Sequence, residues 1–106
     1  MPVYIPATTT LFDLIYTDHA ASIAIGGAGQ TVMPINRKRA LMFFLNESDT
    51  NMRIAWGPQS ASATVGFLVQ PLYYFEPPVA PTENMTVYCA ASGKQFSAGE
   101  FTYTAA

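Results

Sequence analysis

The sequence predicts an all-β protein, an antiparallel sandwich or barrel that forms a single domain. Short runs rich in branched and aromatic residues recur along the chain, and clusters of Gly, Pro, Asn or Ser separate them at intervals of roughly 8–12 residues. Its 106 residues suffice to bury one hydrophobic core without metals or several disulfides. The best helical candidate, residues 13–24, is partly β-branched and runs into glycines, so we expect two strands there, around Asp18 and His19.

The expected strands follow the apolar runs in chain order. They cover residues 3–5, 11–17, 22–25, 31–35, 40–46, 52–56, 65–70, 73–76, 85–91 and 100–104. Turn-forming residues mark the connections, above all at 26–29, 57–60, 77–81 and 91–94. Residues 1–10 carry no internal pairing signal, so we expect an extended N-terminal arm there and a sandwich domain over residues 11–106.

Two dense apolar runs, residues 41–45 and 52–56, flank the polar segment 46–51. Such runs on either side of a cluster of turn formers predict a β-hairpin of two antiparallel strands. The first run is apolar on both faces, so we expect its second face to be covered as well, by a neighbouring subunit. The second run alternates, which predicts that Trp56 faces the core between the sheets, together with Cys89.

The composition predicts association. Only 11% of the residues are charged, against roughly 25% in an average soluble domain. So much uncharged surface favours a symmetric homo-oligomer, and we expect a trimer. The net charge of −2 argues against nucleic acid as a partner, because phosphate binding needs a basic surface. The sequence shows neither a secretion signal nor an apolar run of roughly 18 residues, so we expect a soluble protein without a membrane partner, made in a cytoplasm.

No motif predicts catalysis, a cofactor or a metal. The glycine-rich run 23–29 begins like a dinucleotide-binding turn, but Pro34 follows too soon for the helix that such a turn requires. His19 stands beside Asp18, and we expect Asp18 to cap a turn rather than to orient a catalytic base. One Cys and one His are too few for zinc, and the acidic alternation in 47–51 lacks the glycine and distal glutamate of a calcium loop. We therefore expect a protein that is not an enzyme.

The segments with the fewest internal partners predict the contact surface. The arm offers an extended backbone without a partner, and one basic run concentrates most of the positive charge. The expected contact residues are Pro2, Val3, Tyr4, Ile5, Pro6, Arg37, Lys38 and Arg39. We expect the arm to add to a sheet edge of the partner, and the basic run to set orientation and association rate.

A wider pattern spans residues 39–100. It consists of Arg39-x-Leu-x-Phe-x-Leu-Asn46, Ser48-Asp49, Met52-x-Ile-x-x-x-Pro58, Phe67-Leu-Val-x-Pro71, Tyr74-x-Glu76, Pro81-Thr82, Val87-x-Cys-Ala-Ala-Ser-Gly-Lys94 and Glu100. In this order the pattern resembles small virion proteins of tailed bacteriophages, in which a strand ending in Asn-x-Ser precedes a second strand, a proline corner, an aromatic strand and a terminal glycine hairpin. The chain departs from them at Leu72, where such proteins often carry a glycine after the proline.

The resemblance implies a jelly-roll-like sandwich that acts by binding a virion, as a decoration or cement protein on the capsid surface. Its partners would then be the major capsid protein and further copies of itself. A second function also fits the resemblance: a head- or tail-fibre module that binds host-surface glycans through Tyr73, Tyr74 and Trp56. The sequence contains neither a trimerising coiled coil nor a repetitive stalk, and this favours the capsid function.

Overall fold

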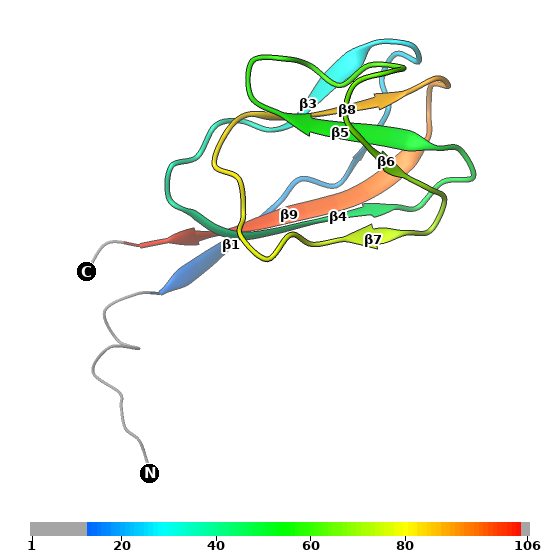
Figure 1. The fold of residues 1–106 in the computed structure, drawn as a ribbon. Coiled ribbons are helices and arrows are strands. Elements are labelled where there is room, and N and C mark those ends of the chain that lie inside the picture. Colours follow the sequence, from blue (N-terminus) through cyan, green and yellow to red (C-terminus); the bar gives the residue numbers. More distant parts are fainter. Residues whose placement is uncertain (1–12, 105–106) are drawn as a thin grey trace.

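Two antiparallel β-sheets pack face to face in residues 13–104, the part of the chain that the computed structural model describes (Figure 1). Sheet A has the strand order β1–β9–β4–β7, and β2 also pairs with β9. Its strands are β1 (Leu14–Asp18), β2 (Ala21–Ser22), β4 (Arg39–Asn46), β7 (Tyr74–Phe75) and β9 (Gln95–Tyr103). Sheet B has the order β3–β8–β5–β6. Its strands are β3 (Gly29–Met33), β5 (Met52–Trp56), β6 (Phe67–Val69) and β8 (Met85–Cys89).

The chain passes from one sheet to the other at almost every connection. After β1 and β2 in sheet A, the chain enters sheet B with β3, returns with β4, and crosses again to β5 and β6. It then alternates once more through β7, β8 and β9. This alternation, with the long-range pairs β1–β9, β4–β9 and β3–β8, is the strand order of a jelly roll. The predicted all-β, antiparallel sandwich is confirmed, and residues 13–104 contain no helix.

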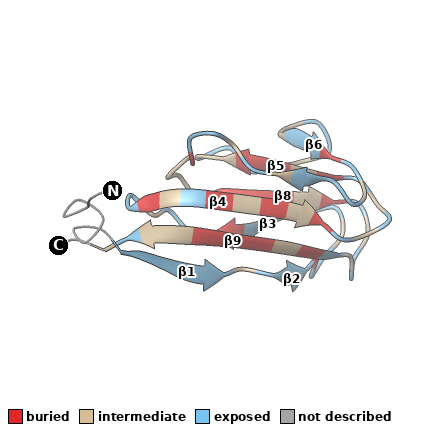
Figure 2. Cartoon of the chain, turned by 90° about the horizontal axis from the view of Figure 1, so that it is seen from below, coloured by how far each residue is buried: buried red, intermediate tan, exposed pale blue. Residues whose placement is uncertain are grey.

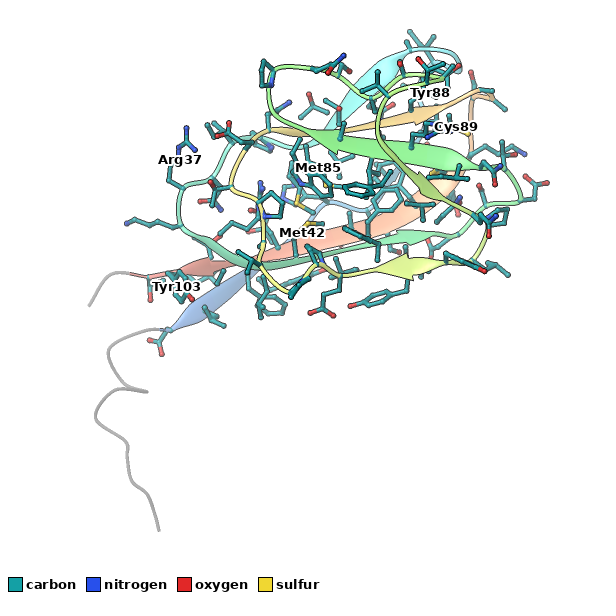
Figure 3. The ribbon with its side chains drawn as sticks, in the orientation of Figure 1. Arg37, Met42, Met85, Tyr88, Cys89 and Tyr103 are labelled. Carbon is teal, nitrogen blue, oxygen red and sulfur yellow. The ribbon has the colours of Figure 1, made fainter. Side chains whose placement is uncertain are left out.

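The core lies between the sheets and is built by alternate residues of the central strands. Met42 and Phe44 point inward from sheet A, and Ile54, Met85 and Val87 face them from sheet B. Figure 3 shows Met42 and Met85 in this interior, and Figure 2 shows the buried positions concentrated on the central strands. Each fully buried side chain of this size contributes roughly 1.5–3 kcal/mol, so the core holds the two sheets together.

Most strands lie where the sequence predicted them. β5 coincides with the predicted run 52–56, and β4, β6, β7 and β8 overlap their predicted runs within a few residues. β9 is much longer than predicted, because it begins at Gln95 rather than at Glu100. Its first half contains Ala98 and Gly99, which are poor strand formers and hide the signal. The predicted strand at residues 3–5 lies outside the described residues.

The predicted hairpin of residues 41–45 and 52–56 is wrong. β4 pairs with β9 and β7 in sheet A, whereas β5 pairs with β8 and β6 in sheet B. The connection crosses between the sheets around the buried side chain of Asn46. Its Nδ2 donates to the carbonyl oxygens of Thr50 (2.8 Å) and Val69 (2.9 Å), and its Oδ1 accepts from the Ser48 N–H (2.9 Å). Two strands that face each other across a sandwich carry the same apolar pattern as the two strands of a hairpin.

Cys89 is fully buried, as predicted, but Trp56 is only half-buried. The Trp56 ring packs against the core cluster, and its centroid is 5.9 Å from those of both Phe67 and Phe75. These three rings close the gap between β6 of sheet B and β7 of sheet A. Trp56 thus belongs to the margin of the core rather than to its centre.

A tight turn at residues 70–73 leads into β7. The Tyr73 N–H donates to the Gln70 carbonyl (3.1 Å), Pro71 occupies the second position, and Leu72 in the third has a φ of 66°. These are features of a type II turn, whose third position favours glycine. Leu72 therefore occupies a position where the backbone suits glycine.

Candidate functional site

The strongest candidate for a functional surface is the side of sheet A that faces away from sheet B. Alternation along β4 points Leu41, Phe43 and Leu45 outward, and the strand register sets outward-facing rings of the neighbouring strands beside them. We call this surface the outer face; it is formed by Tyr16, Leu41, Phe43, Leu45, Tyr74 and Phe101. It presents rings and leucines where a solvent-facing sheet surface ordinarily carries polar side chains.

Four of these rings form a row across all four main strands of sheet A. Tyr16 of β1 packs on Phe101 of β9 (centroids 5.1 Å apart) and stacks with Phe43 of β4 (6.4 Å), which in turn stacks with Tyr74 of β7 (5.9 Å). Gly99 of β9 lies beneath the row, and a Cβ there would stand 2.5 Å from the Tyr16 ring and 2.8 Å from Phe43. Glycine at this position is therefore what allows the two rings to meet above β9.

The second face of residues 41–45 is covered only in part by these neighbours. Phe43, Leu45 and Phe101 are half-buried, whereas Leu41 and Tyr74 stay exposed, Tyr74 to 58%. The expected cover from a neighbouring subunit remains a prediction. Exposed apolar surface of this continuity on a small domain is typical of an interaction site.

The two tyrosines of the row lie on the edge strands β1 and β7, and each forms a hydrogen bond with a carboxylate. The Tyr16 hydroxyl donates to Asp18 Oδ1 (3.1 Å), and the Tyr74 hydroxyl donates to Glu76 Oε1 (2.8 Å). Desolvation, the hydrogen bond to Asp18 and its charge raise the pKa of Tyr16 above its ordinary value. The hydrogen bond to Glu76, with desolvation and the charge of that carboxylate, does the same to the pKa of Tyr74. The outer face thus has an apolar centre and an acidic rim.

Two basic side chains lie at one end of the sandwich, and we call Arg37 and Lys38 the basic corner. Both are exposed, and Figure 3 shows Arg37 at the same end of the molecule as Tyr103. The Tyr103 N–H donates to the Lys38 carbonyl (2.8 Å), which ties this corner to the end of β9. Arg37 forms a surface ion pair with Glu83 (2.8 Å), worth at most about 1 kcal/mol, so a partner can displace it.

The expectation that Arg39 belongs to this contact surface is wrong, because its side chain is completely buried. Its Nε donates to Glu100 Oε1 (2.8 Å), and its other N–H groups donate to the carbonyl oxygens of Pro34, Pro81 and Glu83. A buried guanidinium requires this many acceptors. Arg39 therefore fastens two loops to sheet A and is not available to a partner.

Glu100 is the centre of this buried network. Its carboxylate also accepts from Asn36 Nδ2 (2.8 Å), and its second oxygen lies 2.6 Å from His19 Nε2. Burial opposes ionisation of Glu100, but the hydrogen bonds from Arg39, Asn36 and His19 outweigh it and lower its pKa. His19 and Glu100 are distant in sequence but in contact in the fold, so His19 is part of this buried network. Asp18 caps the turn as expected, with Oδ1 3.4 Å from the Ala20 N–H.

The remaining predicted contact residues do not form one group. Pro2, Val3, Tyr4, Ile5 and Pro6 lie outside the described residues. Tyr73 and Tyr74 are both exposed, but Tyr74 belongs to the outer face while Trp56 packs on Phe75, on the inner side of β7. The three aromatic residues named for glycan binding are therefore not assembled into one platform.

Sequence reasoning missed Tyr16 and Phe101. The signal for Tyr16 was present, since alternation in residues 14–18 puts Leu14, Tyr16 and Asp18 on one side. What the sequence did not show was the pairing of β1 with β9, which brings the two rings together from distant parts of the chain.

Within residues 13–104, no group of three or more His, Cys, Asp and Glu side chains is arranged to hold a metal ion. In the acidic segment 47–51, Asp49 pairs with Lys94 (2.7 Å) and accepts from the Thr50 hydroxyl (2.9 Å). These contacts lower the pKa of Asp49, with the hydrogen bond from Lys94 as the main cause. The same part of the chain has no helix of the length and apolarity needed to cross a membrane.

No protein-family model matches the sequence, and neither a curated protein nor a solved structure matches it.

Proposed function

We propose that this protein is a structural subunit of a bacteriophage virion, one that associates with copies of itself and binds coat subunits on the capsid surface. The observation that carries the proposal is the outer face of sheet A, a continuous row of partly exposed rings with flanking leucines. The resemblance of residues 39–100 to small phage virion proteins is the reason for proposing a phage capsid as the assembly that this face binds.

Three features support a binding role over catalysis. The outer face has the anatomy of a protein interface, with an apolar centre and a polar rim. The jelly roll is a fold that viral capsid domains use, although fold alone does not give function. The buried ionisable groups Arg39 and Glu100 are engaged with each other and with loop carbonyls, as in a structural network.

The acidic rim and the basic corner indicate which surface of the coat fits. A complementary coat surface would present an apolar strip flanked by basic groups toward Asp18 and Glu76, and acidic groups toward Arg37 and Lys38. Such complementarity sets orientation and association rate, while the apolar centre supplies most of the affinity. The N-terminal arm stays in the proposal as a second contact, through residues 2–6.

The test compares virus particles made with and without this protein, by negative-stain imaging and sedimentation. Purified protein is then added back to particles that lack it. Replacing Leu41 and Tyr74 by lysine puts two charges on the outer face, and we expect saturation of the particles to be lost. Leu68 and Val79 are also apolar and exposed but lie elsewhere, so their double lysine variant is the matched control and should bind normally.

Two results would contradict the proposal. Equal binding by both double variants would exclude the outer face as the contact. Particles without any density for this protein, combined with retention of the protein on host-surface glycans, would favour the fibre function instead.

A further inference from the structure

We infer that the edge strand β1 is a self-association site, at which two copies pair antiparallel about a twofold axis and join their A sheets into one continuous sheet. The inference rests on β1 itself and does not require the coat as a partner. It concerns residues 14–18 and the kind of partner that fits them, which is a second copy of the same strand.

The described strands leave several sheet edges, and β1 is the one without protection. β7 has two residues and β6 has three, which is too short to offer a useful template. β3 has a register shift between Thr31 and Met33 and is followed by Pro34. β1 pairs regularly with β9 over five residues, contains neither proline nor lysine, and is exposed along its whole length (Figure 2).

The hydrogen-bond pattern shows which backbone groups point to this edge. The Asp13 carbonyl accepts from the Thr104 N–H (2.9 Å), and the His19 N–H donates to the Ala98 carbonyl (2.8 Å). Hydrogen-bonded positions alternate along an antiparallel pair, so every second residue between Asp13 and His19 faces β9. Leu14, Tyr16 and Asp18 therefore direct their N–H and C=O groups outward, where no strand of residues 13–104 pairs with them.

One register satisfies all of these groups. If Tyr16 lies opposite Tyr16 of the second copy, Leu14 lies opposite Asp18 in both directions, and all three residues exchange N–H···O bonds across the axis. On the other face of the strand, Ile15 meets Thr17 of the second copy. Ile15 is 55% exposed in a single copy, so it gains cover from a branched neighbour. The Asp18 carboxylates stay apart, so no like charges meet directly.

Twofold pairing also brings the two outer faces side by side. Tyr16 of one copy would lie beside Tyr16 of the other, so the two ring rows would form one continuous surface twice as long. Isologous pairing about a twofold axis gives a closed dimer, the commonest form of homo-oligomer. A dimer is therefore the assembly that this edge specifies, in place of the trimer expected from composition.

A mixed cysteine experiment on the full chain reads the register directly. Ile15 and Thr17 of the second copy form a non-hydrogen-bonded pair, whose Cα atoms lie about 4.5 Å apart, within the range that a disulfide bridges. We expect mild oxidation to cross-link an equimolar mixture of Ile15→Cys and Thr17→Cys chains, and neither variant alone. The native Cys89 is fully buried and does not compete. Failure of the mixture to cross-link, or equal cross-linking of one variant alone, would overturn the register.

A second measurement tests the edge without cysteines. Tyr16→Pro removes an N–H that points away from β9, and Tyr16→Val removes the ring equally but keeps that N–H. Light scattering over a range on the order of 1–100 µM should find a wild-type dimer, with a dimer Kd at least about 100-fold higher for the proline than for the valine variant. Circular dichroism checks that both variants fold. Equal Kd values for the two variants, or a monomeric or trimeric wild type, would refute the inference, and loss of capsid binding by an intact dimer would count only against the proposed function.

Discussion

Leu72 has a backbone conformation that is unfavourable for leucine, and its exposed side chain gains no stabilising burial. Its φ of 66° lies in the left-handed region, and 74% of the residue is exposed. A non-glycine residue in that region destabilises the folded state by roughly 1–2 kcal/mol. Glycine avoids this strain, but it makes the unfolded chain more flexible, which cancels part of the gain in stability. The type II turn at residues 70–73 gives the physical reason, because its third position favours glycine.

Replacing Leu72 by glycine should therefore stabilise the protein. We expect Leu72→Gly to raise the free energy of unfolding by about 0.5–1 kcal/mol, measured by urea denaturation. Leu72→Ala is the control, because it shortens the side chain but keeps the Cβ and the strain. A glycine variant no more stable than the alanine variant would show that the turn does not strain leucine.

The basic run shows the limit of sequence reasoning at the scale of single residues. Arg37, Lys38 and Arg39 are consecutive and chemically alike, yet only Arg39 is buried. Its fate depends on Glu100 and on two loop carbonyls from residues 81 and 83, which are remote in sequence. The residues adjacent to Arg39 in the sequence do not indicate these partners.

At the scale of elements, the strands were predictable and their partners were not. Both bounds of β5 were predicted correctly, because local alternation and the flanking turns indicate where a strand begins and ends. Pairing is decided by contacts between distant residues, as in β4 with β9, and the nearest apolar run was the wrong choice for β4. For the same reason, residues 41–45 predicted an apolar second face of β4, formed by Leu41, Phe43 and Leu45, but not the rings that lie beside it.

The crossing from β4 to β5 should depend on Asn46. Replacing it by alanine leaves the carbonyl groups of Thr50 and Val69 without their donor in a buried site. We expect Asn46→Ala to lower the free energy of unfolding by about 2–4 kcal/mol. Asp49→Ala, in the same connection, removes only the exposed contacts of Asp49 with Lys94 and the Thr50 hydroxyl, so it should leave the free energy of unfolding nearly unchanged. Thermal denaturation of both variants makes the comparison, and similar losses would mean that Asn46 does not organise the crossing.

At the scale of the whole molecule, the network around Glu100 links loops from both halves of the sequence, at residues 34–36 and 81–83, to sheet A. Its lowered pKa means that Glu100 binds its proton less readily in the folded than in the unfolded protein. The resulting stabilisation is fully present above the ordinary pKa, near 4.5, and is lost as the pH falls through the lower folded value.

Glu100→Gln should cost about 3–5 kcal/mol at neutral pH, since it leaves the buried Arg39 guanidinium without its counter-charge. The wild type should lose stability steeply on acidification, whereas the variant should show a flatter profile in denaturation measured between about pH 2 and pH 7. Glu83→Gln, which breaks only the exposed pair with Arg37, should behave like the wild type. Parallel pH profiles for Glu100→Gln and the wild type would exclude this role for Glu100.

The position of β9 has a consequence for the synthesis of the protein. This strand is the interior neighbour of β1, β2 and β4, yet it occupies residues 95–103, so sheet A lacks its middle until these residues have left the ribosome. Nascent chains are made in order from the N-terminus, and strand pairs far apart in sequence form late. Until then, β4 lacks its longest partner strand and can pair only with the two-residue strand β7, so the growing chain keeps apolar surface and an unpaired strand edge open to aggregation.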